Sequence, residues 1–173
     1  MKKIILLLLV VSFVLISCGK QYNQGDSFEY KSKEGNNFTI KVESSNLAMW
    51  ISKKDGTIIK RLDVTVSFKN EETKEIEINA DNKFIEVDNQ VIGIKGASNM
   101  DEKTSSNESL GDMLDRAKNL KVKPGLSKTI DFMYDLPANP NTDINIIWGL
   151  YKGKDGGFEY KVSLTPKIES YNN

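Results

Sequence analysis

Histidine is absent from the 173-residue chain, and cysteine occurs once, as Cys18. Serine–histidine and cysteine–histidine nucleophile systems are therefore excluded in their usual forms, because both need an imidazole as the base. Zinc, copper and non-haem iron sites lose their main protein ligands for the same reason. A glycine-rich phosphate loop is also missing, since Gly93-Ile94-Lys95-Gly96 lacks the spacing and the Lys-Ser/Thr ending. We expect no enzyme activity, no cofactor and no metal site.

An excess of charge of either sign is missing too, because 24 basic residues stand against 24 acidic ones. Nucleic-acid-binding surfaces need clustered positive charge to replace the counterions of the phosphates. The balanced composition therefore gives no reason to expect a nucleic-acid partner.

The long apolar run lies at the start of the chain, at residues 4–16, directly after Lys2 and Lys3. It is too short to cross a bilayer core of about 30 Å as a stable anchor. A charged start, an apolar middle and a small residue before the cut are typical of a secretory signal. Leu15-Ile16-Ser17-Cys18 resembles the bacterial lipobox, which implies cleavage before Cys18 and attachment of lipid to it. The alternative is an ordinary secretory signal with an incidental cysteine.

Four segments follow from this interpretation of the N-terminus. They are a signal peptide at 1–17, a lipidated Cys18 with a flexible tether at 18–36, one domain at 37–168, and a tail at 169–173. The tether is polar and has too little apolar surface to order itself, although Phe28-Glu29-Tyr30 is compatible with a short edge strand. The mature length suffices for one self-sufficient core, and without a disulfide its stability has to come from that core.

Alternation of apolar and polar residues dominates from residue 37 onward, which is the pattern of half-buried β-strands. The clearest segments are 38–42, 62–68, 130–134, 144–150 and 158–164. Asp55-Gly56 and Asp155-Gly156-Gly157 supply the positive φ that tight turns need. We therefore predict an all-β fold, an immunoglobulin-like antiparallel β-sandwich of about 7–9 strands.

The segment 97–119 differs from the rest because it is polar and poor in strand-forming residues. Ser109-Leu110-Gly111-Asp112 resembles a helix N-cap with an acid three residues later. Apolar residues then recur at helical spacing, at Leu110, Met113, Leu114 and Ala117. One short helical insertion of about two turns is predicted here, covering an open end of the sandwich.

Several strand and turn motifs carry a family resemblance. A strand ends in Asn70 before an acidic turn, Phe84-Ile85-Glu86-Val87-Asp88-Asn89 gives a strand and turn, and Lys123-Pro124-Gly125 precedes an aromatic strand that ends at Pro137. The order resembles a bacterial immunoglobulin-like lipoprotein domain of unknown function, whose members often carry a misleading telomeric-repeat-binding-factor label. That family shares its fold with a secreted mycobacterial antigen. The resemblance covers residues 36–166 and implies fold and location, with no activity to transfer.

Paired carboxylates are the remaining candidates for chemistry. They are Glu71-Glu72, Asp101-Glu102, and Asp112 with Asp115. Such pairs serve acid–base catalysis in a cleft or bind calcium. Because each pair lies in a predicted loop or on a helix surface near lysine, we interpret all three as solvated charge.

The aromatic residues separate into core and surface candidates. Trp148 lies within the apolar alternation of 144–150 and is predicted to pack between two sheets, whereas Trp50 is assigned either to the core or to a surface contact. We interpret four tyrosines as rim residues suited to an interface, namely Tyr22, Tyr30, Tyr151 and Tyr171.

These observations favour a non-catalytic binding module that the lipid on Cys18 attaches to the cell membrane or the outer membrane. Its domain would face the periplasm or the cell exterior and contact a protein or glycan. The loops at one end of the sandwich and the 97–119 insertion are the expected contact sites. Two alternatives stay open, a carrier of a small apolar ligand between the sheets and a carboxylate-based hydrolase.

Overall fold

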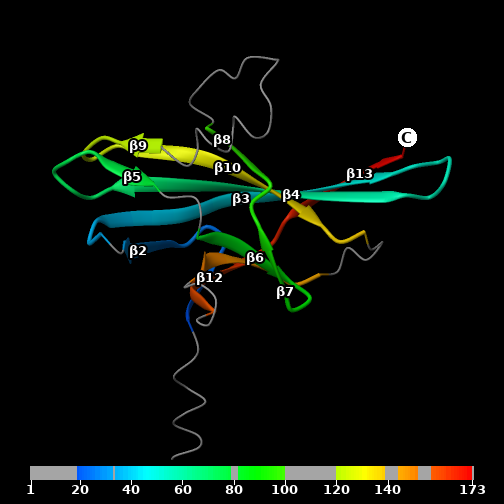
Figure 1. Cartoon of the computed structure of the whole chain (residues 1–173), viewed down its shortest axis with the longest axis horizontal. Coiled ribbons are helices and arrows are strands. Elements are labelled where there is room, and N and C mark those ends of the chain that lie inside the picture. Colours follow the sequence, from blue (N-terminus) through cyan, green and yellow to red (C-terminus); the bar gives the residue numbers. More distant parts are fainter. Residues whose placement is uncertain are drawn as a thin grey trace, which may run out of the picture.

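The computed structural model describes residues 19–32, 34–78, 82–99, 120–138, 144–151 and 157–172. These ranges contain thirteen β-strands and no helix. Most of the strands form two sheets that share one hydrophobic core (Figure 1). The prediction of an all-β sandwich is therefore confirmed. The predicted 7–9 antiparallel strands are wrong in number and direction, because residues 20–23 and 167–172 also form strands and pair in parallel with their neighbours.

The first sheet has five strands in the order β1-β12-β11-β6-β7. Their bounds are β1 Lys20–Asn23, β12 Phe158–Leu164, β11 Ile146–Tyr151, β6 Lys83–Val87 and β7 Gln90–Gly93. The pairs β12–β11, β11–β6 and β6–β7 are antiparallel, while β1 runs parallel to β12.

The second sheet follows the order β13-β3-β4-β10-β8, with β2 also paired to β3. The bounds are β13 Lys167–Asn172, β3 Asn37–Ile51, β4 Ile58–Asn70, β10 Ser127–Leu136, β8 Gly96–Asn99 and β2 Ser27–Lys31. Here β13 runs parallel to β3, and the other pairs are antiparallel. A separate antiparallel pair joins β5 (Ile76–Ile78) to β9 (Leu120–Val122).

Alternate side chains of both sheets fill the space between them, as the period of two requires. Trp148 on β11 is fully buried, which confirms its predicted place in the core. Its indole Nε1–H donates a 3.0 Å hydrogen bond to the hydroxyl of Tyr134 on β10, so a polar contact joins the two sheets in the interior. Phe132 packs on Trp148 with ring centroids 6.5 Å apart.

The turn after β4 is organised by the buried Asn70. Its Nδ2 donates to the carbonyl oxygens of Lys74 and Val122 at 2.8 Å each, and its Oδ1 accepts from the backbone N–H of Glu72 at 2.7 Å. Its backbone N–H and C=O pair with Leu126 and Gly125. One residue therefore connects the acidic turn to β9 through its side chain and to the turn before β10 through its backbone.

The predicted tether at 18–36 is wrong for residues 20–23 and 27–31, which form β1 and β2. The edge strand expected at Phe28-Glu29-Tyr30 is confirmed as part of β2. Phe28 is buried because it stacks on Tyr22 at 4.6 Å and on Tyr160 at 5.2 Å. Tertiary contacts thus supply the apolar surface that the local sequence lacks.

Two further boundaries need correction. The tail predicted at 169–173 is wrong for residues 169–172, because β13 pairs along its whole length with β3. The insertion predicted from residue 97 begins later, since β8 places Ala97 in the core opposite Phe132. The helix predicted from Ser109 lies outside the described residues, as do the signal at 1–17 and Cys18.

The β3–β4 hairpin extends past the rest of the sandwich, as Figure 1 shows. These strands have 15 and 13 residues, and the neighbouring β10 pairs with β4 only as far as Lys60. Along the other side of this extension, β13 pairs with residues 46–51 of β3. We call residues 50–59 of the hairpin together with β13 the arm.

Candidate interaction surface on the arm

Three apolar side chains lie in one row across the outer face of the arm. The strand registers place Tyr171 opposite Trp50 and Trp50 opposite Ile59. The rings of Trp50 and Tyr171 stack with centroids 5.8 Å apart at an angle of 17°. Tyr171 is 42% exposed and Ile59 is 60% exposed, so the row is open to solvent although it belongs to a paired sheet.

Hydrogen bonds within β13 hold the Tyr171 ring in place. Its hydroxyl donates to one carboxylate oxygen of Glu169 at 2.5 Å, and Lys167 Nζ donates to the other at 2.8 Å. The bond from Lys167, followed by the one from Tyr171, keeps the pKa of Glu169 below its usual value. A ring fixed in this way loses little conformational freedom when a partner binds.

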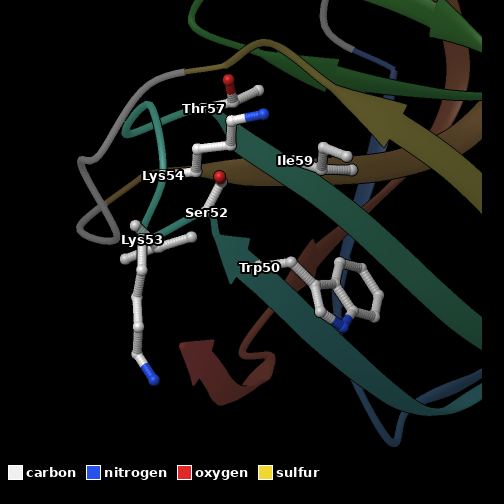
Figure 2. Close-up of a pocket in the computed structure, with 7 residues that line it drawn as sticks. Trp50, Ser52, Lys53, Lys54, Thr57 and Ile59 are labelled. Carbon is white, nitrogen blue, oxygen red and sulfur yellow. The ribbon is translucent and has the colours of Figure 1, made fainter. Parts of the chain in front are cut away.

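A pocket of about 410 Å³ adjoins this row at the end of the hairpin. Figure 2 shows Trp50 and Ile59 on adjacent strands of the pocket, with the side chain of Lys53 reaching away from them. The lining is mostly apolar. Its residues are Trp50, Ile51, Ser52, Lys53, Lys54, Thr57 and Ile59.

The turn at the end of the hairpin is built as the Asp55-Gly56 motif predicts. Gly56 has a φ of 70°, and its N–H donates to the carbonyl oxygen of Ser52 at 2.9 Å. Asp55 Oδ1 accepts the backbone N–H of Thr57 at 3.0 Å. This bond, with a further one from Ser52, lowers the pKa of Asp55 to about 2. The Asp55 carboxylate therefore serves the turn, while Lys53 and Lys54 stay exposed at the tip.

Beside the arm, the outer face of the same sheet is polar. Asn46 and Asp63 lie opposite each other on β3 and β4, and within the described ranges one oxygen of each is buried without a hydrogen-bond partner. Burial raises the pKa of Asp63. These two oxygens are closed to solvent and therefore offer no contact to a large partner.

The predicted carboxylate pair Glu71-Glu72 takes part in surface hydrogen bonds. Glu71 accepts from Thr39 Oγ1 at 2.7 Å, and Glu72 accepts from the backbone and side-chain N–H groups of Asn37 at 2.9 and 2.6 Å. The bond from Thr39 lowers the pKa of Glu71. Both acids attach the turn to the start of β3. Asp101-Glu102 and Asp112 with Asp115 lie outside the described residues.

The four predicted rim tyrosines have different surroundings. Tyr22 and Tyr30 pack around Tyr160, Tyr151 packs on Phe84 and Phe158, and Tyr171 lies on the arm. Burial raises the pKa of the Tyr30 hydroxyl. Only Tyr171 of these four contributes to the exposed row.

Sequence reasoning missed Ile59. The signal for it was present, because Ile58-Ile59 places two aliphatic residues in succession and consecutive residues of a strand point to opposite faces. One of the two had to point away from the core.

No group of three acidic, histidine or cysteine side chains that suits a metal ion occurs in the described part of the chain. The same residues contain no helix long and apolar enough to cross a membrane.

Comparison with known proteins supports the fold and leaves the function open. No family model and no curated protein matches the chain. An uncharacterised β-sandwich protein from Clostridium difficile is 17% identical with a TM-score of 0.54, covering 86% of this chain and 96% of that one. A secreted protein from Mycobacterium tuberculosis is 7% identical with a TM-score of 0.51, covering 85% and 98%. At these identities the likeness shows a shared β-sandwich fold.

Proposed function

We propose that this protein is a lipid-anchored, non-catalytic binding module of the bacterial envelope, with an immunoglobulin-like sandwich that contacts another protein through the arm. The lipobox-like sequence at Cys18 supports the anchor. The row of Tyr171, Trp50 and Ile59 supports the contact site. Of the contact sites expected from the sequence, residues 100–119 of the insertion lie outside the described residues, and we propose the arm as the contact site.

The observation that carries the proposal is the gathering of exposed apolar side chains on the arm. Five large apolar side chains are exposed in the described residues, and two of them, Ile59 and Tyr171, lie beside Trp50 on the outer face of the arm. Scattered exposed apolar residues are ordinary on a protein surface. Aromatic and aliphatic residues gathered beside a pocket are typical of the central part of a protein interface.

The chemistry of the pocket favours a protein over the other partners. Its mostly apolar lining suits an apolar side chain inserted by a partner, and the exposed Lys53 and Lys54 suit acidic residues around it. A carrier would hold its ligand between the sheets, where Trp148, Phe132 and Phe68 are fully buried.

Replacing Ile59 with serine, or Trp50 with alanine, should weaken partner binding by about thirtyfold, the effect of losing about 2 kcal/mol at an interface hot spot. The thermal unfolding midpoint should change little, because both side chains are partly or largely exposed. A photo-reactive cross-linker at position 59 in intact cells identifies the partner, and titration of the purified pair gives the affinity.

Leu126→Ser is the matched control for Ile59→Ser, since Leu126 is 56% exposed and lies in the turn before β10. It should leave partner affinity unchanged. Equal losses for Leu126→Ser and Ile59→Ser would show that general surface hydrophobicity is measured, and the arm would lose its role.

The anchor is tested by metabolic labelling with a clickable palmitate analogue. The wild-type chain should incorporate the label, and Cys18→Ser should incorporate none, because the thiol is the acceptor. Ser17→Ala, which keeps a small residue before the cut, should label like the wild type. Label in the Cys18→Ser variant would contradict lipidation at this position.

A further inference from the structure

The strand β13 forms an open edge of the second sheet. Of its two sides, one pairs with β3, and no pairing to the other side occurs among the described strands. With six residues it is longer than the other edge strands β1, β2, β7 and β8, which have four or five. Natural proteins protect such edges with proline, charge or very short strands, because open backbone groups pair with other chains.

This edge also exposes an aliphatic side chain that the proposed partner site does not use. Ile168 is 46% exposed and lies in register with Leu47, whereas Tyr171 lies in register with Trp50. Residues 168 and 171 are three apart and therefore point to opposite faces of the strand. Ile168 is therefore not part of the Trp50 row.

We propose that β13 pairs antiparallel with β13 of a second copy of this chain, with Ile168 opposite itself on the two-fold axis. The sequence Lys167-Ile168-Glu169 is self-complementary in this register. Each Lys167 lies opposite Glu169 of the second copy on one face of the joined strands, and the two isoleucines meet on the other face. Cross-strand contacts of both kinds stabilise antiparallel pairs.

The neighbouring registers of the β13 pair are less favourable than the one centred on Ile168. A shift that places Glu169 on the axis sets two carboxylates directly opposite each other, which is destabilising. A shift to Ser170 sets Ile168 opposite Asn172. Registers with the axis between two residues pair side chains from opposite faces and are excluded by the pleat. The ion pair between Lys167 and Glu169 within one chain is solvent-exposed, so exchanging it between copies costs little.

The dimer has a consequence for the arm. An axis perpendicular to the joined sheet places both outer faces on the same side. Two Trp50 rows then face one direction, which gives a partner two contacts at once and raises its effective affinity. The pairing itself depends only on β13, so failure of the proposed partner site would not contradict it.

Site-specific thiol cross-linking tests the register, since the wild-type chain has one cysteine, Cys18. Ile168→Cys and Tyr171→Cys are each expressed as the full chain in cells and treated with an oxidant. The two Cβ atoms at position 168 should lie about 5 Å apart, within reach of a disulfide. Those at position 171 should lie about 20 Å apart, six residues along the strand. Ile168→Cys should therefore yield a covalent dimer on a non-reducing gel, while Tyr171→Cys and the wild type should yield none.

Charge reversal supplies a second measurement. Adding Lys167→Glu to the Ile168→Cys variant should reduce cross-linking about tenfold, because attraction on both sides of the axis becomes repulsion. Adding Glu169→Lys as well should restore it. No dimer at position 168, or equal dimer at positions 168 and 171, would overturn the proposal. A cross-link from position 168 to a different protein would overturn it as well.

Discussion

Replacement of Trp148 with alanine should lower the free energy of unfolding by about 4 kcal/mol, as large-to-small substitutions of buried aromatic residues do. Trp148 is fully buried and contacts Phe132 and Tyr134 on the opposite sheet. Alanine leaves a cavity and removes the donor of the 3.0 Å hydrogen bond to Tyr134. Urea denaturation followed by circular dichroism measures the change.

Two variants define the source of this loss. Tyr134→Phe keeps the packing but leaves the indole N–H buried without an acceptor, so it should cost about 2 kcal/mol. Trp50→Ala removes a partly exposed indole and should cost clearly less than Trp148→Ala. If Trp148→Ala and Trp50→Ala proved equally destabilising, the distinction between the core tryptophan and the arm tryptophan would fail.

Replacement of Asn70 with alanine should cost about 3 kcal/mol, although the side chain is small and polar. The loss leaves the carbonyl oxygens of Lys74 and Val122 and the N–H of Glu72 without their partner. Each buried polar group that loses its hydrogen bond costs about 1–3 kcal/mol. The same denaturation measurement tests this value.

Asn70→Asp separates hydrogen bonding from packing. It keeps nearly the same volume and an acceptor for Glu72, but it loses both donated bonds and sets a carboxylate against two carbonyl oxygens. We therefore expect it to destabilise at least as much as alanine. Asn37→Ala, in the exposed contact with Glu72, is the control and should cost less than about 1 kcal/mol. An Asn70→Asp variant as stable as the wild type would refute the assigned role.

The strands with strict alternation were predicted correctly because their pattern is a local property. In the segment 62–68, Leu62, Val64, Val66 and Phe68 point to one face at a spacing of two and are buried in β4. The Asp55-Gly56 turn was predicted for a similar reason, since positive φ is a property of single residues. Asn70 also stood out in the sequence as the end of a strand, but its contacts with Val122, Gly125 and Leu126 became visible only in the fold.

The segments that were predicted wrongly depend on partners far along the chain. Residues 20–31 have few apolar side chains of their own, and Phe28 becomes buried between Tyr22 and Tyr160, which β12 brings against it. β13 is ordered by pairing with β3, more than a hundred residues earlier. Strand pairing satisfies backbone hydrogen bonds without demanding a strong local pattern, so such strands leave little trace in the sequence.

The sequence by itself determined the all-β class, the core position of Trp148, the tight turn at Asp55-Gly56 and the absence of histidine chemistry. These depend on composition and on the period of two. The arm was decided only by the tertiary structure. Strands β3 and β4 extend beyond their neighbours, and the strand registers bring Tyr171, Trp50 and Ile59 together. Both features arise from contacts between strands that are distant in the sequence. Alternation shows which residues share a face, but only strand pairing decides whether that face is covered.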